Sequence, residues 1–375
     1  MVEKCMCLKT SCSHYRMVED DRDRKSLQLN DNKYILLYTN FWHFENWMLP
    51  AETVGSDYFR NYNCPIMNCV VTTNHKLLER PTDYDAVVFH VGAQWEYSWF
   101  HKIPSTRTPR QIYVAATMEP PPHTFHLLEK DENFFNWTMA YRSDSDVLWT
   151  YAEILSVETG LRVSHSENPQ WLPWDRAYRN ESLLRLTRRK SKVAVQFASH
   201  CNTFSKRQEF VHQIQKYIQV DVYGKCGTLA CLKYSNQCYD VLDTDYWFYF
   251  AFENCLCTDY VTEKLYGSMK KYVVPVVFGG ADYRKFAPPH SYIDAQQFSS
   301  ISELVEYLQY LMDHPEEYVK YFWWKQHYRI VEAEPFCDLC QKLHNLPDGE
   351  RIQHYRNIKT WWFDEMCHQE PKIRF

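Results

Sequence analysis

A carboxylate and an ammonium group stand side by side after the most apolar run of the sequence. Glu263 and Lys264 follow the run Tyr246–Phe252 and the polar segment Asp259–Thr262. A ribose diol needs a carboxylate, a pyrophosphate needs a cation, and a purine needs a flat apolar wall. Glu263, Lys264 and Tyr260 could supply these three groups. A Glu-Lys pair alone is most often surface electrostatics, so the wider pattern must support a nucleotide site.

A second carboxylate that could do chemistry is Glu119. It follows the apolar run Ile112–Ala116 and precedes Pro120–Pro122, whose restricted backbone angles hold a loop rigid. A carboxylate held in this way could act as a general base toward an attacking hydroxyl. Taken alone, a carboxylate on a loop is usually only solvated.

Two patterns could bind a metal ion. Asp144-Ser145-Asp146 has the DxD spacing that can hold a divalent ion on a diphosphate, but the same spacing recurs at 83–85 and 243–245. A zinc site could be drawn from Cys337-x-x-Cys340 with His344, Cys367 and His368. The remaining spacings of that group are irregular, which makes zinc the weaker interpretation.

These residues need a scaffold, and the hydrophobic pattern predicts parallel α/β sheets, because short apolar runs alternate with polar stretches of helical character. Ser205 and Gln208 resemble a capping box ahead of apolar residues at helical spacing. This pattern predicts a helix after the strand Val193–Ala198. The predicted strands are Tyr34–Tyr38, Ala86–Val91, Ile112–Ala116, Val193–Ala198, Val220–Tyr223, Tyr246–Phe252 and Val273–Phe278.

The length of 375 residues predicts two domains, since a typical domain has about 100–200 residues. A connector at 168–192, rich in Pro and Trp and ending in a basic run, separates the two groups of strands. We therefore predict a polar N-terminal segment at 1–33, an N-terminal α/β domain at 34–185, a C-terminal α/β domain at 186–331 and a cysteine-containing tail at 332–375.

Composition excludes several functional classes. A hydrophobic fraction of 45% and an aromatic fraction of 17% exclude a disordered chain. The net charge of -5 argues against nucleic acid as a partner, because phosphate binding needs an excess of Lys and Arg. Only 9 glycines are present, without GxGxxG or GxxxxGK[ST], which disfavours a dehydrogenase or a P-loop nucleotidase.

The 14 cysteines favour an oxidising compartment. Two sequons, at Asn136 and Asn180, agree with passage through the secretory lumen. Met1–Asp31 is polar and holds neither a signal-peptide core nor an apolar span. We interpret this start as that of a fragment, a shorter isoform or an incomplete gene prediction, with a cytosolic protein as the alternative. The disulfide candidates are Cys64, Cys69, Cys226, Cys231, Cys337 and Cys340.

The run FENCLCTDYVTEKLYGSMKKYVVPVVFGGADYRKFAPPHSYIDAQQF, from Phe252 to Phe298, closely resembles the C-terminal donor-binding signature of the α1,3/4-fucosyltransferase family. The resemblance extends to MEPPPH at 118–123, NWTMAYRSDSD at 136–146 and VDVYGKCG at 220–227. It implies the GT-B arrangement, in which two Rossmann-like domains face each other across a cleft.

The resemblance implies a role for each matching residue. Glu119 is expected to be the catalytic base, Glu263 to bind the ribose of the donor and Lys264 to bind its diphosphate. Ser199 and Arg207 are expected on the phosphates, and Val222 and Tyr223 beside the guanine. The full set of implied donor contacts is Ser199, Arg207, Val222, Tyr223, Asn254, Tyr260, Glu263, Lys264, Tyr141 and Arg142.

Two further features are interpreted through the resemblance. It implies that Cys337 and Cys340 form disulfides with Cys64 and Cys69, which replaces the zinc interpretation. It also makes the Asp144-Ser145-Asp146 triplet a helix or turn feature. A metal-dependent transferase of another fold type, using Asp144 and Asp146, stays as an alternative.

The activity implied is inverting transfer of L-fucose from GDP-β-L-fucose to the 3-hydroxyl of GlcNAc in a glycoprotein N-glycan, in the Golgi lumen. No cofactor is required, although stimulation by a divalent metal stays open, and a full-length form would be membrane-anchored. The segment Cys226–Cys231 and the aromatic tail resemble those of invertebrate-type enzymes that act on the innermost N-glycan GlcNAc, and this resemblance implies the core GlcNAc as acceptor. The alternatives are Lewis-type antennal transfer and an inactive relative that binds GDP or glycans.

Overall fold

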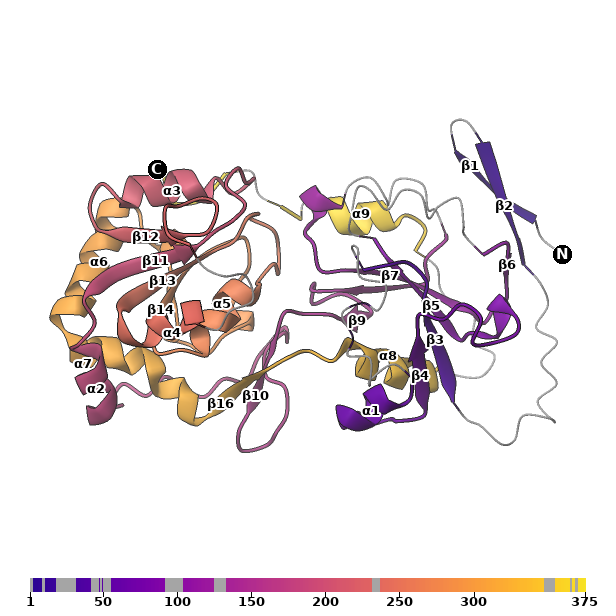
Figure 1. Cartoon of the computed structure of the whole chain (residues 1–375), viewed down its shortest axis with the longest axis horizontal. Coiled ribbons are helices and arrows are strands. Elements are labelled where there is room, and N and C mark those ends of the chain that lie inside the picture. The colour runs from indigo at the N-terminus through magenta and orange to yellow at the C-terminus, as the bar shows by residue number, and fades with distance from the viewer. Residues whose placement is uncertain are drawn as a thin grey trace. The chain divides into compact units, whose positions relative to one another are not determined.

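The computed structural model describes residues 3–8, 11–17, 32–41, 47, 49, 55–91, 104–124, 133–230, 237–346, 355–364, 366–367 and 370–375. The chain forms two structural units, each drawn in Figure 1. Unit 1 comprises Met1–Thr150 and Glu334–Asp364, and unit 2 comprises Tyr151–Ala333 and Glu365–Phe375.

Unit 1 contains a parallel sheet of β3 (Lys33–Leu37), β4 (Cys69–Thr72), β5 (Ala86–His90), β7 (Ile112–Thr117), β8 (Trp137–Ala140) and β9 (Val147–Leu148). Their order is β4-β3-β5-β7-β8-β9. The helices are α1 (Asp57–Asn61), α8 (Pro335–His344) and α9 (Ile358–Phe363), with 3-10 turns at Pro81–Asp83 and Pro121–His123. A second sheet joins β1 (Glu3–Leu8), β2 (Ser11–Met17) and β6 (Thr106–Arg107).

Unit 2 contains a parallel sheet of β11 (Lys192–Phe197), β12 (Val220–Tyr223), β13 (Tyr246–Phe252), β14 (Val274–Phe278) and β15 (Ile293–Asp294), in the order β12-β11-β13-β14-β15. Its α-helices are α2 (Glu181–Thr187), α3 (Arg207–Ile214), α4 (Gln237–Thr244), α5 (Glu263–Met269), α6 (Ile301–Asp313) and α7 (Pro315–Val319). Turns of 3-10 helix lie at Tyr283–Lys285, Ala295–Gln297 and Lys320–Gln326, and β10 (Glu153–Ser156) pairs antiparallel with β16 (Tyr328–Val331).

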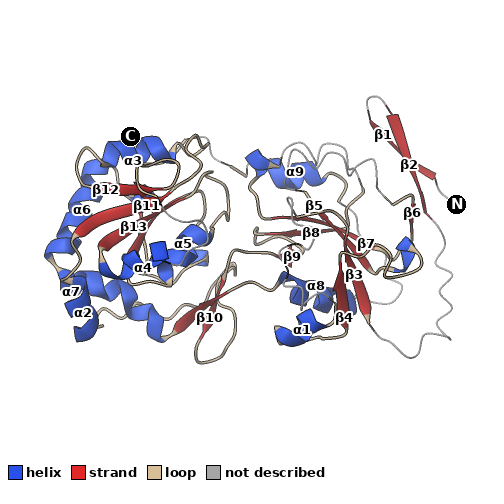
Figure 2. Cartoon of the chain, viewed as in Figure 1, coloured by secondary structure: helices blue, strands red, loops and turns tan. Residues whose placement is uncertain are grey.

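Helices cover both faces of the unit 2 sheet (Figure 2). All seven residues of β13 are buried, and neighbouring residues of a strand point to opposite faces. On one face, Phe210 of α3 stacks on Phe252. On the other, Tyr249 lies against Phe197, which in turn contacts Tyr239 of α4. A strand covered on both faces must be apolar at every position, which explains the unbroken aromatic run.

The predicted strands are confirmed, and each unit carries the parallel α/β sheet expected of a Rossmann-like domain. The predicted helix after β11 is also confirmed, but its capping box is wrong. Lys206 is the N-cap, in a left-handed conformation, and the Ser205 hydroxyl instead donates to the backbone oxygen of Glu253 at 2.6 Å. Among the described helices, none combines the length and the apolar character that a membrane span requires.

The division into units differs from the sequence-based boundaries, because segments distant in sequence complete each core. Residues 151–185, assigned by sequence to the N-terminal domain, pack in unit 2, where Ile154 is fully buried and β10 pairs with β16. The tail is shared. Phe336 and Leu339 of α8 join the core of unit 1, and α8 lies beside β3 and β9 (Figure 1).

The last residues of the chain return to unit 2. Cys367 forms a disulfide with Cys257, and the backbone NH of Thr258 donates to Met366 at 2.7 Å. Ile373 is fully buried in the core of unit 2, and Phe375 stacks on Phe210. The tail therefore closes over α3 and the loop that follows β13.

Four disulfides join described cysteines: Cys64–Cys337, Cys69–Cys340, Cys201–Cys226 and Cys257–Cys367. The first two are the pairs that the resemblance implied. Cys226 pairs with Cys201, and Cys231 lies outside the described residues. Cys201, Cys257 and Cys367 were not among the disulfide candidates.

In a protein that already lacks the neighbouring bond (Cys64→Ala with Cys337→Ala), we expect the further substitutions Cys69→Ala and Cys340→Ala to lower the free energy of unfolding by about 2–5 kcal/mol, because the Cys69–Cys340 bond then closes a long loop alone. Denaturant unfolding, with peptide mapping to verify the bonds, measures the change. Cys255→Ala is the control, because Cys255 is buried but forms no disulfide. Equal losses in the two variants would show that the bond itself contributes nothing.

Candidate functional site

The carboxyl edge of the unit 2 sheet brings together most of the predicted donor residues. Loops after parallel strands meet at this edge, where α/β proteins commonly bind ligands. β13 ends at Phe252, and α5 begins at Glu263 with Thr262 as its N-cap. β11 leads in the same way into α3, which begins at Arg207.

A buried carboxylate, Glu253, organises this edge. Its side chain is 1% exposed and accepts hydrogen bonds from the backbone NH of Thr262 at 2.9 Å and from the Thr262 hydroxyl. Burial raises the pKa of Glu253, and the ammonium group of Lys264, 3.1 Å away, opposes that rise. Sequence reasoning missed Glu253, although a carboxylate directly after a wholly apolar strand is a usable signal.

Lys264 lies between three oxygens. Its Nζ donates to the Thr262 hydroxyl at 2.7 Å and lies 3.1 Å from Glu253 and 3.2 Å from Glu263. Burial would lower the pKa of Lys264, but the two carboxylates raise it above its ordinary value, so the group stays cationic. The Glu263 side chain is 59% exposed, which leaves its carboxylate accessible to hydroxyl groups.

Arg207 is buried, with 3% of its surface exposed, and ties two loops together. Its guanidinium donates to the backbone oxygens of Phe252 at 2.9 Å and His200 at 3.0 Å. Burial lowers the pKa of Arg207, and the nearby carboxylate of Glu253 raises it. The structure therefore shows a loop-holding role, and its predicted phosphate contact stays a prediction.

Asn254 and Tyr260 have different environments. The Asn254 side-chain oxygen is buried and has no hydrogen-bond partner among the described residues. Tyr260 is only 2% exposed, and its ring lies edge to face with Tyr151. The expectation that Tyr260 offers a flat wall to a purine is therefore wrong, because the ring is covered by protein.

The loop after β12 completes the edge. Gly224 has φ +96°, and a Cβ there would lie 2.6 Å from the backbone oxygen of Ala198, so only glycine fits against the end of β11. Ser199 is exposed beside it, and Tyr223 is half-buried. Val222 lines a pocket of about 300 Å³ between β12, the end of α3 and the loop at 226–229.

In unit 1, Glu119 lies where the sequence predicted it, directly after β7 and before the three prolines. Its backbone NH donates to the Thr117 hydroxyl at 3.1 Å, and its Oε2 lies 3.2 Å from Nδ1 of His123. The Glu119 side chain is 24% exposed. A partly exposed carboxylate on a fixed loop can accept a proton from a substrate hydroxyl.

Tyr141 and Arg142 form part of the packing of unit 1. Arg142 donates to both carboxylate oxygens of Asp144, at 2.9 and 2.5 Å, and its guanidinium lies over the ring of Trp361 in α9. Tyr141 is 1% exposed and contacts Trp362. Within unit 1 these two residues hold α9, so their predicted place in the donor site gains no support.

The DxD triplet is occupied by protein partners. Asp144 pairs with Arg142, and Asp146 accepts from Thr138 at 2.9 Å and from the Tyr355 hydroxyl at 3.0 Å. Both carboxylates therefore stabilise the local structure, which agrees with the interpretation of the triplet as a turn feature. Because their oxygens already bind protein groups, they do not fit a metal-binding pair.

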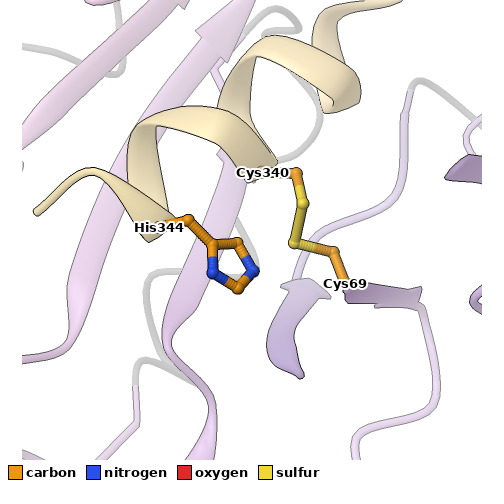
Figure 3. Close-up of side chains that lie close together, drawn as sticks. All are labelled: Cys69, Cys340 and His344. Carbon is orange, nitrogen blue, oxygen red and sulfur yellow. A yellow bond between two sulfur atoms is a disulfide. The ribbon is translucent and has the colours of Figure 1, made fainter. Parts of the chain in front are cut away.

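The zinc interpretation is wrong, because its cysteines are oxidised. Cys337, Cys340 and Cys367 all form disulfides, so none offers a thiolate. Figure 3 shows His344 beside the Cys69–Cys340 bond, close enough to suggest a ligand cluster. The Nε2 of His344 lies 2.9 Å from the backbone oxygen of Asn68, which is its structural partner.

The two sequons differ in accessibility. Asn136 is 3% exposed, and its side-chain oxygen accepts from Arg107 and from the backbone NH of Tyr113. A glycan has no room there, so Asn136 is not a glycosylation site of this fold. Asn180 is half-buried and caps α2 by accepting from the NH of Leu183 at 2.9 Å, and it stays a candidate.

Two family models match this chain, one in its N-terminal and one in its C-terminal part. Residues 187–361 match the model described as glycosyltransferase family 10 (fucosyltransferase) C-term, and residues 30–152 match fucosyltransferase, N-terminal. Alpha-(1,3)-fucosyltransferase C of Drosophila melanogaster is 41% identical over 94% of this chain and 83% of its own. Glycoprotein 3-alpha-L-fucosyltransferase A of the same organism is 32% identical over 88% of this chain and 60% of its own.

The chain can be superposed on a crystal structure of an alpha1,3-fucosyltransferase with GDP. The superposition includes 92% of this chain and 95% of that chain, with a TM-score of 0.49 and 17% sequence identity. The two family models and the 41% identity with the Drosophila relative agree with the motifs on which the resemblance rested. The chain belongs to glycosyltransferase family 10, the fucosyltransferases.

Proposed function

We propose that this protein transfers L-fucose from GDP-β-L-fucose to the 3-hydroxyl of a GlcNAc residue on a glycoprotein N-glycan, with inversion at C1 of fucose. Family membership and the names of the two Drosophila relatives support α1,3 transfer and a glycoprotein acceptor. The observation that carries the donor assignment is the cluster of Glu253, Glu263 and Lys264 at the carboxyl edge of the unit 2 sheet.

The donor chemistry follows from that cluster. Lys264 stays cationic and held in place, so it can stabilise the charge that develops on the departing diphosphate. The exposed Glu263 carboxylate can accept hydrogen bonds from the ribose hydroxyls. We assign Asn254, whose side-chain oxygen is buried without a described hydrogen-bond partner, to the donor site as well. We assign Ser199 and Arg207 to the phosphates and Val222 and Tyr223 to the guanine as part of the same proposal.

The transfer step needs one base. The acceptor oxygen forms a bond to C1 of fucose, the bond from C1 to the phosphate oxygen breaks, and GDP leaves with the electron pair. The proton of the acceptor hydroxyl passes to the carboxylate of Glu119. Attack from the face opposite GDP inverts the configuration at C1.

For the acceptor we propose the innermost GlcNAc, with an antennal GlcNAc as the alternative. Likeness of the Cys226–Cys231 segment and of the tail to invertebrate-type enzymes supports this choice. We also propose the Golgi lumen as the location, which the four disulfides support.

We expect fucose transfer from GDP-fucose to a biantennary N-glycopeptide ending in GlcNAc, and we expect it to persist in chelator, because Lys264 can stabilise the leaving group. Mass spectrometry with linkage analysis of the product measures both. Fucose on the innermost GlcNAc supports the core assignment, and fucose on an antenna replaces it. GDP binding without any product would favour an inactive binding relative, and complete loss in chelator would favour a metal-dependent transferase.

A further inference from the structure

The carboxylate of Glu119 has one side-chain partner among the described residues, the imidazole of His123. Nδ1 of His123 lies 3.2 Å from Oε2 of Glu119, four residues away along the chain. The contact involves one carboxylate oxygen only. Among the described residues, no hydrogen bond is found to the other oxygen, Oε1.

The backbone between these two side chains is fixed. Pro121–His123 form a turn of 3-10 helix, in which the NH of His123 donates to the oxygen of Pro120 at 2.8 Å. At one end, the Thr117 hydroxyl accepts from the NH of Glu119. At the other, the Thr124 hydroxyl accepts from the indole NH of Trp362 in α9 at 2.6 Å. The turn therefore fixes the separation of the Glu119 and His123 backbones.

The pair contributes little to the fold. The side chains of His123 and Glu119 are 22% and 24% exposed, and a pair that reaches solvent is worth little in stability. A carboxylate that acts as a base, by contrast, needs a fixed direction, because a misplacement of about 1 Å can cost about 100-fold in rate. The geometry of the pair therefore fits the orientation of a base better than the stabilisation of the fold.

We propose that His123 is a positioning residue for the base. Its Nδ1–H donates to Oε2 of Glu119, which holds the carboxylate plane so that Oε1 faces the acceptor hydroxyl and takes its proton. This inference rests on the proposed function of Glu119. His123 itself exchanges no proton with the substrate and touches neither sugar.

The inference is tested by steady-state kinetics of His123→Ala, His123→Asn and His123→Gln. The amide nitrogen of Asn stands near the place of Nδ1, whereas that of Gln stands near the place of Nε2. We expect kcat to fall by about 10- to 100-fold in H123A and H123Q and to recover largely in H123N, with the GDP dissociation constant unchanged in all three. Thermal unfolding of each variant reports on the fold.

His314→Ala is the matched control, because the exposed His314 also directs Nδ1 to a group four residues away, the oxygen of Tyr310 at 2.8 Å. A kcat of H123A equal to that of the unaltered protein would overturn the inference, as would equal losses in H123N and H123A. Failure of the proposed function is distinct, since it would show as no transfer by the unaltered protein or as full activity of a Glu119 variant, and either overturns both.

Discussion

Glu119→Gln should lower kcat for fucosyl transfer by about 10²- to 10⁴-fold, the range typical of a lost general base. The amide has nearly the shape of the carboxylate, but it cannot take the proton of the acceptor hydroxyl. Glu119 lies in unit 1, whereas the proposed donor contacts of the carboxyl edge belong to unit 2, so GDP should bind E119Q as it binds the unaltered protein. Initial rates with saturating GDP-fucose and calorimetric titration with GDP measure the two quantities.

Glu158→Gln serves as the control for this experiment, because Glu158 is an exposed loop carboxylate that belongs to unit 2. It should leave kcat and the free energy of unfolding unchanged. Turnover of E119Q at the rate of the unaltered protein would remove Glu119 as the base. Parallel losses of turnover and GDP affinity would show instead that the substitution disturbs the protein as a whole.

Lys264→Met should have two separate effects. Turnover should fall by about 10²- to 10³-fold, because the departing diphosphate loses a preorganised positive charge. The free energy of unfolding should fall by about 3–5 kcal/mol, because the buried carboxylate of Glu253 is left without its counter-charge. GDP-fucose kinetics and denaturant unfolding measure these effects independently.

The double variant Glu253→Gln with Lys264→Met separates them. A neutral amide at 253 can still accept from Thr262, so most of the stability should return while turnover stays low. Recovery of turnover together with stability would mean that Lys264 acts only on the fold. Lys271→Met is the control, since Lys271 pairs with Asp240 at 2.8 Å just beyond the end of α5.

The stability loss in K264M should depend on pH. Burial already raises the pKa of Glu253, and removal of the Lys264 ammonium leaves only the hydrogen bonds from Thr262 to oppose that rise. A carboxyl whose pKa is higher in the folded protein than in the unfolded chain favours folding in acid and loses that contribution as pH rises through the folded pKa. The deficit of K264M should therefore be smaller in acidic than in mildly alkaline buffer.

The strands and the position of Glu119 on a loop after a strand could be predicted from local signals in the sequence, whereas its role as the base came from the family resemblance and stays a prediction. The run Tyr246–Phe252 is apolar at every position because both faces of β13 are covered, and Glu119 is marked by the strand before it and the prolines after it. The two core disulfide pairs of unit 1 came from the family resemblance, and spacing alone did not determine them.

The remaining features depend on contacts between distant segments. Nothing near residue 142 in the sequence indicates that the Arg142 guanidinium lies over the ring of Trp361 in α9. The burial of Asn136 and Tyr260 likewise follows from tertiary packing, and so does the use of Ser205 to hold the loop after β13. The predicted domain boundaries were misplaced for the same reason. Residues of α8 pack in the core of unit 1, and residues 151–185 belong to unit 2, in each case against segments distant in sequence.

The interleaved units constrain the order in which the protein can be made. All of residues 151–333 are synthesised before α8, so the first part of unit 1 leaves the ribosome long before the helix that completes its core. Cys64 and Cys69 must wait as thiols for partners 273 and 271 residues later, and each intervening cysteine is a competitor. Multidomain proteins usually fold from the N-terminus while the chain is being made. Unit 1 cannot complete its fold in this way, because its core includes residues of α8. The sheet of unit 1 therefore stays without the helix that completes its core, and Cys64 and Cys69 without their partners, until residues 334–344 have been made.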